Sequence, residues 1–152
     1  MKSEHYEAVY ALWARCNGVK LSDKDNKAQI LRYLKRNKSL SSVAISNGEI
    51  VGALLCGHDG LKGFIHHIAV DESFRRMGIG QNLVARSLKL LAKQEIGVCQ
   101  IVVSAVNHHG EQFWTELGWK KQDDYLLLTD KPQDRVRSIW QCSLIPVASA
   151  AA

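Results

Sequence analysis

The chain has 152 residues, enough for one domain with a buried core, and 46% of them are hydrophobic, which is ordinary for a water-soluble protein. Its formal net charge is +5, but Lys and Arg are spread along the chain and form no block, which argues against dedicated nucleic-acid binding. No apolar run approaches the roughly 18 residues that span a membrane, and the N-terminus lacks the apolar stretch of a signal peptide, so we expect a cytoplasmic protein with no membrane partner.

The first half of the chain predicts two helices followed by three strands. Apolar residues at helical spacing predict a helix from Ser3 to about Cys16, and Gly18 ends it. Ser22, followed three residues later by Asp25, begins a second helix. The strands expected after it cover residues 40–45, 50–56 and 64–70. Asn47-Gly48, a strong hairpin signal, joins the first two of these strands.

The second half of the chain predicts a basic turn over residues 75–80, and then further helices and strands. The elements expected after the turn are a helix from Gly80 to about Gly97, a strand over 98–106, a helix over 110–117, and strands over 125–129 and 136–144. No linker or repeat divides the chain. We therefore expect one domain over residues 1–146 and a disordered tail over residues 147–152.

The turn Arg75-Arg76-Met77-Gly78-Ile79-Gly80 has the residues that hold a phosphate. It follows the apolar run Ile68-Ala69-Val70 and opens into a strongly helical stretch. Glycine lets the backbone approach an anion closely, and the free N–H groups of a first helical turn point at that anion. The two arginines add full positive charges. A strand, a basic turn and a helix in this order therefore indicate a binding site for a phosphorylated ligand.

Two motifs within this order of elements resemble those of the GNAT superfamily of acetyl-coenzyme A-dependent N-acetyltransferases. The first is Arg75-x-x-Gly78-x-Gly80, which matches the family's Arg/Gln-x-x-Gly-x-Gly/Ala signature after a strand. The second is a block at the spacing of the family's Asn-x-x-Ala-x-x-Leu-Tyr-x-x-x-Gly-Phe segment, and its residues are Asn107, Gly110, Phe113, Trp114, Leu117, Gly118 and Trp119. The resemblance covers roughly residues 3–144.

The resemblance implies an α/β (α+β) fold: a mixed, mostly antiparallel sheet of six to seven strands flanked by about four helices. Family members usually begin with a strand before the first helix. This chain enters a helix almost at Met1, so we expect the first strand to be missing or very short.

Acetyl-coenzyme A is the co-substrate that the resemblance implies. The backbone of Ile68 and Val70 would pair with its pantetheine arm as an added strand, and the amides from Arg75 to Gln81 would hold its pyrophosphate. Asn107 would contact the cofactor near the pantetheine. The cofactor-binding residues expected from the resemblance are Ile68, Ala69, Val70, Arg75, Arg76, Met77, Gly78, Ile79, Gly80, Gln81, Asn107 and Trp114.

The implied activity is that of an acyltransferase, which moves the acetyl group directly to a primary amine of an unidentified small-molecule or peptide acceptor. The amine must lose a proton, and the family's basic groups on this strand match Phe64 and His66. Only His66 can do proton chemistry, so it is the candidate general base. Strand alternation places His67 on the opposite face, where we expect a structural role.

Trp114 stands where the family usually has a tyrosine that protonates the departing thiolate. An indole cannot usefully give up a proton, so the general acid stays unassigned, with His108 and His109 as further candidates. The same departure favours the alternative function, a non-catalytic module that binds acyl-coenzyme A. A dinucleotide-binding domain is disfavoured, because Leu83 stands where its fingerprint needs a third glycine.

The cysteines Cys16, Cys56, Cys99 and Cys142 are far apart and form no Cys-x-x-Cys pair, which argues against a zinc site and a disulfide framework. We therefore expect no metal. Cys56 has no evident base partner, so we reject a covalent mechanism through it. Tyr125 is a weak candidate for the acceptor side, and family members often form homodimers.

Overall fold

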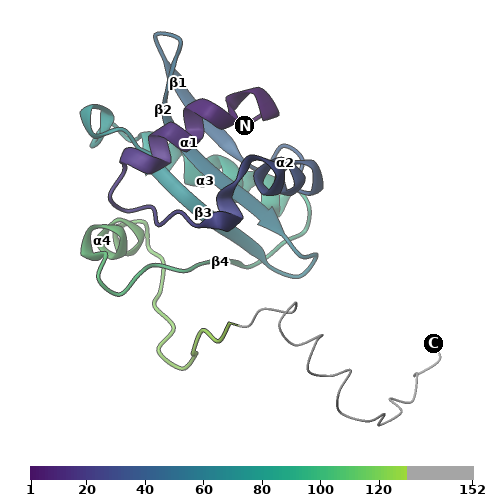
Figure 1. The fold of residues 1–152 in the computed structure, drawn as a ribbon. Helices are drawn as coiled ribbons and strands as arrows, with labels where there is room; N and C mark the ends of the chain where they lie inside the picture. The colour runs from purple at the N-terminus through teal and green to yellow at the C-terminus, as the bar shows by residue number, and fades with distance from the viewer. Residues whose placement is uncertain (130–152) are drawn as a thin grey trace, which may run out of the picture. The chain divides into compact units, whose positions relative to one another are not determined.

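The computed structural model describes residues 1–129, and the chain divides into two units, Met1–Trp119 and Lys120–Ala152. The helices of the first unit are α1 (Tyr6–Arg15), α2 (Lys27–Arg36), α3 (Ile79–Ala92) and α4 (His108–Glu116) (Figure 1). Its strands are β1 (Ser42–Ser46), β2 (Glu49–His58), β3 (Gly63–Val70) and β4 (Cys99–Ile101). Short 3-10 helices are η1 (Ser3–His5), η2 (Asp23–Asp25) and η3 (Glu72–Phe74).

The four strands form one mixed sheet in the order β1-β2-β3-β4. The pairs β1–β2 and β2–β3 are antiparallel, whereas β3 and β4 are parallel. Residues Gly63–Ile65 of β3 pair with the whole of β4, and the rest of β3 has no neighbour on that edge among the described residues. The sheet therefore opens on one side at the carboxyl end of β3.

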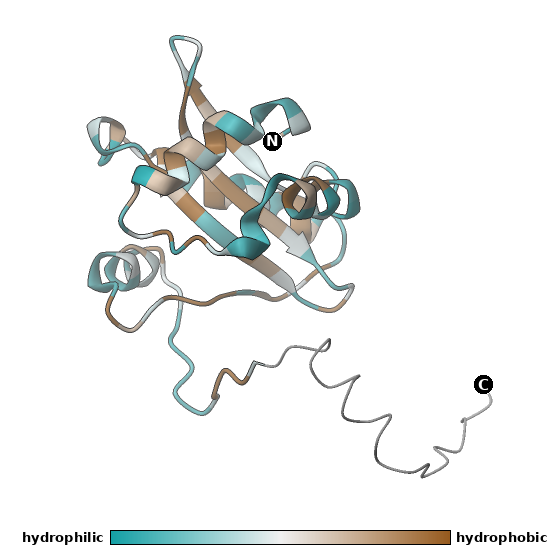
Figure 2. Ribbon diagram, in the orientation of Figure 1, coloured by the Kyte–Doolittle hydropathy of each residue, from teal (hydrophilic) through white to brown (hydrophobic). Residues whose placement is uncertain are grey.

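Helices cover both faces of this sheet, with α1 and α2 on one face and α3 on the other (Figure 1). Alternation along β2 supplies both cores: Ala53 and Leu55 pack under α1 and α2, while Leu54 and Cys56 pack under α3. Figure 2 shows apolar residues along the central strands and polar residues on the outer turns of the helices. A mixed sheet between two helical layers agrees with the fold class expected from the sequence.

A bulge at His67 interrupts the alternation along β3. Leu55 pairs with His66 and Ala53 pairs with Ala69, so one residue of β2 opposes two residues of β3. His67 has φ of +47°, in the left-handed region. The residues after the bulge are therefore shifted by one position relative to simple alternation.

Both histidine rings lie on the α1–α2 face because of this bulge. The His66 ring is 5.9 Å from the ring of Tyr33 on α2, and the His67 ring is 5.1 Å from the ring of Trp13 on α1. Ile68, by contrast, packs with the core under α3. The expectation that His66 and His67 face opposite sides of the sheet is therefore wrong.

Several element boundaries differ from the expectation. The strand expected over residues 98–106 is only Cys99–Ile101, because pairing with β3 ends there and Val102 and Val106 are exposed. The helix expected to reach Gly97 ends at Ala92. Residues 125–129 form no strand, and four strands are seen in residues 1–129 against the six to seven expected. The strand expected over residues 136–144 and the tail over 147–152 lie outside the described residues.

At the start of the chain, η1 precedes α1 and no strand does, as expected. Within residues 1–129, no helix has the length and apolar composition that crossing a membrane requires.

Candidate functional site

The turn between β3 and α3 presents a row of unpaired backbone amides. Gly78, which precedes α3, has φ of +77°, and Arg76 has φ of +65°. This left-handed backbone turns the chain sharply into the helix. No acceptor within residues 1–129 meets the N–H groups of residues 76–81. Free donors at the positive end of a helix suit an anion such as a pyrophosphate.

The two arginines of this turn differ in their contacts. Arg75 Nε donates to the carbonyl oxygen of Val70 at 3.2 Å, and its Nη1 lies 3.8 Å from Glu72 Oε1. Arg76 is exposed and has no ion pair or hydrogen bond with its side chain in the described part of the chain. Arg75 thus ties the turn to the end of β3, while Arg76 is the cation more available to a ligand.

Gly80 marks the place where the two sequence motifs meet. A Cβ atom at this position would lie 3.2 Å from Cε2 and Cζ of Phe113 and 3.7 Å from Cγ2 of Val70. Contacts of 3.2 Å are tighter than nine in ten real Cβ contacts, so the close approach of α3 to Phe113 favours glycine here. This side of the helix faces packed side chains.

The open edge of β3 leads towards this turn. Asp71 donates its N–H to the Val51 carbonyl at 2.8 Å, so Val70, one residue earlier, directs its N–H and C=O away from β2. The Val70 carbonyl accepts from Arg75 and is 3.8 Å from the Cys16 thiol sulfur, while its N–H faces the open edge. An open strand edge with unpaired groups can accept an extended chain as a further strand.

His66 lies on the α1–α2 face, where β4 has already left β3. Its ring stacks on Phe64 at 6.4 Å and meets Tyr33 at 5.9 Å. Desolvation by these surroundings is the main cause that lowers the pKa of His66; His67 lowers the pKa further and Asp25 opposes the shift. The imidazole is therefore mostly neutral near pH 7, which is the form that accepts a proton.

A cavity of about 190 Å³ adjoins His66, and its walls are Tyr33, Arg36, Asn37, Gly57, His58, Asp59, Phe64 and His66. The Tyr33 hydroxyl oxygen is buried and has no hydrogen-bond partner among the described residues. Burial raises the pKa of Tyr33, so the phenol keeps its proton and stays a donor. The cavity thus offers a polar ligand an unused hydrogen-bond donor near the His66 imidazole.

His67 forms a close pair with a carboxylate that sequence reasoning did not identify as functional. Its Nε2 lies 2.6 Å from Oδ1 of Asp25, which is 7% exposed. The other carboxylate oxygen accepts the N–H and the hydroxyl of Ser22 at 2.7 and 3.0 Å. Burial raises the pKa of Asp25, but the hydrogen bonds from His67 and Ser22 outweigh it and hold this pKa below its usual range.

The Ser22-x-x-Asp25 spacing was the available signal for this carboxylate. It predicts a capping box, and the structure has one at η2. The capping contact uses one oxygen of Asp25, and local spacing cannot reveal that the other oxygen reaches β3.

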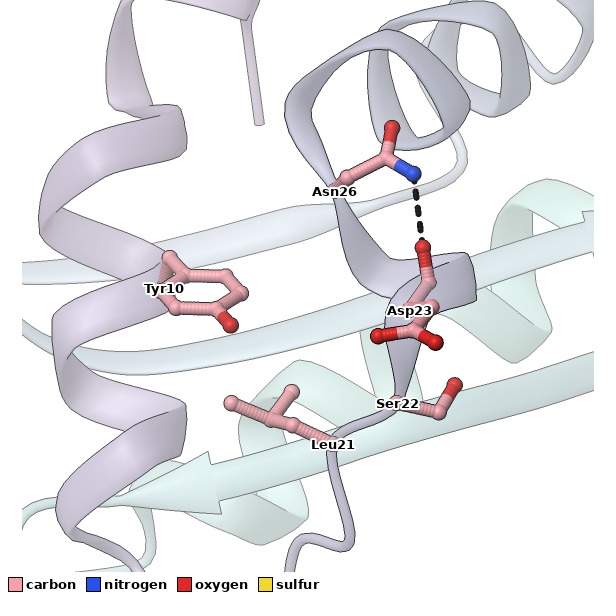
Figure 3. Close-up of a pocket in the computed structure, with 5 residues that line it drawn as sticks. All are labelled: Tyr10, Leu21, Ser22, Asp23 and Asn26. Atoms are coloured by element: carbon pink, nitrogen blue, oxygen red, sulfur yellow. Dashed lines mark hydrogen bonds between the residues drawn. The ribbon is translucent and has the colours of Figure 1, made fainter.

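A broad groove of about 500 Å³ lies between α1 and η2, and its walls are Tyr10, Leu21, Ser22, Asp23 and Asn26 (Figure 3). Asn26 Nδ2 donates to the backbone oxygen of Asp23 at 2.6 Å and helps to fix this wall. Ser22 belongs both to the groove and to the support of Asp25. The groove and the Asp25–His67 pair are therefore joined through one residue.

Asn107 and Trp114 have structural roles that the sequence did not define. Asn107 caps α4, where its Oδ1 accepts the N–H of Gly110 at 2.9 Å. Trp114 is 5% exposed, and its ring lies 4.6 Å from Trp119 and 5.1 Å from Phe113. Among the described residues, the Asn107 amide nitrogen has no hydrogen-bond partner, whereas little of Trp114 is exposed. Their contacts with a cofactor stay predictions.

The remaining candidates differ in exposure. Cys56 is fully buried, and burial raises the pKa of its thiol to about 12, so it is not a ready nucleophile. His108 and His109 begin α4 and are exposed. Tyr125 belongs to the second unit. Residues 1–129 contain no cluster of three or more His, Cys, Asp or Glu side chains placed to hold a metal ion.

The chain belongs to the acetyltransferase (GNAT) family, whose sequence pattern matches residues 6–119. Among its relatives, the acetyltransferase SG1711 of Sodalis glossinidius (strain morsitans) is 29% identical over 127 residues, which are 84% of this chain and 89% of that protein.

Solved structures share the fold. The PaiA N-acetyltransferase of Thermoplasma acidophilum, solved with coenzyme A, has a TM-score of 0.70 at 19% identity, over 82% of this chain and 89% of that one. The aminoglycoside N-acetyltransferase AAC(6')-Iy, solved with a bisubstrate analogue, has a TM-score of 0.66 at 17% identity, over 86% of this chain and 95% of that one.

Proposed function

We propose that the chain is an N-acetyltransferase that moves the acetyl group of acetyl-coenzyme A directly to a primary amine of a small molecule or peptide. The observation that carries this proposal is the succession of the open β3 edge and the free amides of residues 76–81. A long ligand with an extended amide-bearing arm and a pyrophosphate needs these two features side by side. Coenzyme A is such a ligand.

The family supports the co-substrate. One solved relative contains coenzyme A and another contains a coenzyme A bisubstrate analogue. For this chain we assign the pantetheine to Ile68, Ala69 and Val70, and the pyrophosphate to the turn. The turn residues are Arg75, Arg76, Met77, Gly78, Ile79, Gly80 and Gln81. Asn107 completes the assignment through its side-chain amide nitrogen, which has no partner within residues 1–129.

The chemistry requires a neutral amine. The amine nitrogen attacks the thioester carbonyl, the carbon–nitrogen bond forms, the carbon–sulfur bond breaks, and coenzyme A leaves as a thiolate. We assign His66 as the general base, because it lies on the α1–α2 face at the opening of the sheet and its lowered pKa keeps it neutral. General-base help of this kind is worth roughly 10²–10⁴-fold in rate.

The acceptor would approach from the α1–α2 face. The cavity beside His66 and the groove beside Ser22 both lie among elements of this face, and each has a carboxylate in its wall, Asp59 and Asp23 respectively. A carboxylate attracts a protonated amine before it reacts. AAC(6')-Iy is an aminoglycoside N-acetyltransferase, which makes polycationic amines the first compounds to try with this chain.

A non-catalytic acyl-coenzyme A-binding module is the second candidate function, and Trp114 in place of the family's tyrosine favours it. The test is release of free thiol from acetyl-coenzyme A over a panel of aminoglycosides, polyamines, amino acids and peptide N-termini. Amine-dependent thiol release supports the transferase. Tight binding of coenzyme A without turnover of any amine would replace it with the binding module.

A further inference from the structure

His67 occupies a position that needs support from its surroundings. Its backbone is left-handed in the middle of a strand, with φ of +47°, a conformation that side chains rarely adopt. Such local strain persists where neighbouring contacts over-determine it, and it gathers at functional sites. Here the contacts are the 2.6 Å bond to Asp25 and the packing of Trp13 against the ring at 5.1 Å.

The hydrogen bond to Asp25 determines which ring nitrogen of neutral His67 carries the hydrogen. Nε2 carries the hydrogen and donates it to the ionised carboxylate, so Nδ1 has the free lone pair. No described residue forms a hydrogen bond with Nδ1, and the side chain is 22% exposed. The imidazole can therefore receive a proton while its position stays fixed.

The two neighbouring imidazoles have opposite surroundings. His66 packs against the uncharged rings of Tyr33 and Phe64 and is otherwise exposed, so no described carboxylate in contact stabilises a positive charge on it. His67 has a nearly buried carboxylate in contact, which stabilises the same charge. The ring centroids are 6.5 Å apart, close enough for one water molecule to lie between the two rings.

This arrangement extends the proposed acetyltransferase function, on which the inference rests. We propose that the proton that His66 takes from the acceptor amine passes on to Nδ1 of His67, and that Asp25 orients His67 and stabilises its imidazolium. His66 is thereby returned to the neutral form. The proton then leaves His67 for solvent, and the coenzyme A thiolate takes a proton from solvent, so the exchange balances.

The elements packed against the pair bring few other charged groups. The residues that they contribute are Tyr6 and Trp13 from α1, Ser22 from the start of η2, Leu55 from β2, and His66 from β3. The Tyr6 hydroxyl donates to the backbone oxygen of Asp25 at 3.0 Å and does not compete for the carboxylate. Lys27, at the start of α2, is bound to Glu7 at 2.7 Å.

The test compares the wild type with Asp25→Asn and His67→Gln, using acetyl-coenzyme A and an accepted amine from about pH 6 to about pH 10. We expect each variant to lower kcat/KM by about 10–100-fold near pH 7. The loss of kcat/KM relative to the wild type should shrink towards about pH 10. There the amine is already neutral, and hydroxide can take the proton that the amine nitrogen releases during the reaction. Because the two residues act as one unit, the double variant should be no slower than the slower single variant.

His5→Gln is the matched control, since His5 is also a histidine beside a carboxylate, with Nε2 3.7 Å from Glu4. It should leave kcat/KM unchanged at every pH. The affinity for coenzyme A should stay the same in all variants. Nitrogen NMR of the wild-type histidine rings gives a reading that needs no variant: His67 should be the Nε2–H tautomer.

Three outcomes overturn the relay, that is, the proton transfer from His66 to His67. The first is an equal loss of rate at all pH values, which indicates a merely structural role. The others are no loss of rate in either variant and an Nδ1–H tautomer at His67. If a variant fails to fold, the other variant and the NMR reading still decide. A wild type that turns over no amine overturns the acetyltransferase function, and the relay with it. Normal turnover with unaffected variants overturns the relay alone.

Discussion

Nε2 of His67 lies 2.6 Å from Oδ1 of Asp25, although 42 positions separate the two residues in the chain. The contact joins η2 to the middle of β3, and it exists because the bulge turns His67 to the α1–α2 face. Without the extra residue, alternation would direct this side chain towards α3. The pair therefore depends on the native register of β3.

Asp25→Asn should weaken the fold at neutral pH by about 1.5–3 kcal/mol, the usual worth of hydrogen bonds to a charged group. The folded-state pKa of Asp25 lies below the value of about 3.9 for an unfolded aspartate. The stability that its carboxylate contributes is therefore complete above about pH 4 and is lost as the pH falls through the lower folded-state pKa. The free energies of unfolding of wild type and variant, measured in urea, should converge in acid. A difference in free energy of unfolding that stays the same at every pH would contradict a stabilising role of the Asp25 carboxylate.

His66→Ala should lower turnover by about 10²-fold and leave the affinity for coenzyme A nearly unchanged. Since the pKa of His66 is lowered, the wild type keeps a neutral base to below about pH 6.5. Below that pKa, log kcat/KM should rise more steeply with pH than above it, and the variant should lack the steeper part. A variant with the wild-type profile would exclude His66 as the base.

The local parts of the fold and the site could be predicted from the sequence. Periodicity and the Asn47-Gly48 turn gave the helices and the hairpin, and the Gly78-x-Gly80 spacing gave the turn before α3. These features depend on residues that are neighbours in the chain. The same holds for Ser22, whose capping box is present at η2.

The predictions that proved wrong depend on contacts between residues that are far apart in the chain. The side on which His67 lies depends on a bulge, which adds one residue to β3 against β2 and leaves no mark in an apolar strand pattern. The length of β4 depends on where its partner diverges, since residues 102–106 are as rich in valine as a strand. The sequence around Asp25 predicts only a helix cap, because its second contact, with His67, is 42 positions away in the chain.

Gly80→Ala should destabilise the protein by at most about 1–2 kcal/mol, because the better helix propensity of alanine, about 1 kcal/mol, offsets part of the usual cost of overpacking, about 1–3 kcal/mol. The new methyl group would lie 3.2 Å from the ring of Phe113, which itself packs against Trp114. Gly97→Ala is the control, because nothing lies within 4 Å of a Cβ there and no positive φ is involved. It should be neutral or slightly stabilising in thermal unfolding. Equal effects of the two changes would contradict the close packing of α3 on Phe113.

Arg76→Glu should weaken binding of coenzyme A about 10–100-fold, because it replaces a charge-assisted hydrogen bond, worth about 1.5–3 kcal/mol, with a repulsive charge. Arg76 is the exposed arginine of the turn, so its replacement removes no contact that holds the described fold together. The dissociation constant, measured by calorimetry, should also lose part of its salt dependence, because a screened attraction has gone. The change in affinity should appear with coenzyme A alone and needs no acceptor.

Lys93→Glu makes the same change of charge at the other end of α3, about 21 Å away along a helix of 14 residues. At that distance, between about two and three Debye lengths at physiological salt, the altered charge should have little effect on a pyrophosphate at the turn. Coenzyme A should therefore bind to this variant nearly as tightly as to the wild type. If both variants lose affinity equally, net charge rather than the turn attracts the ligand. If neither does, the pyrophosphate lies elsewhere.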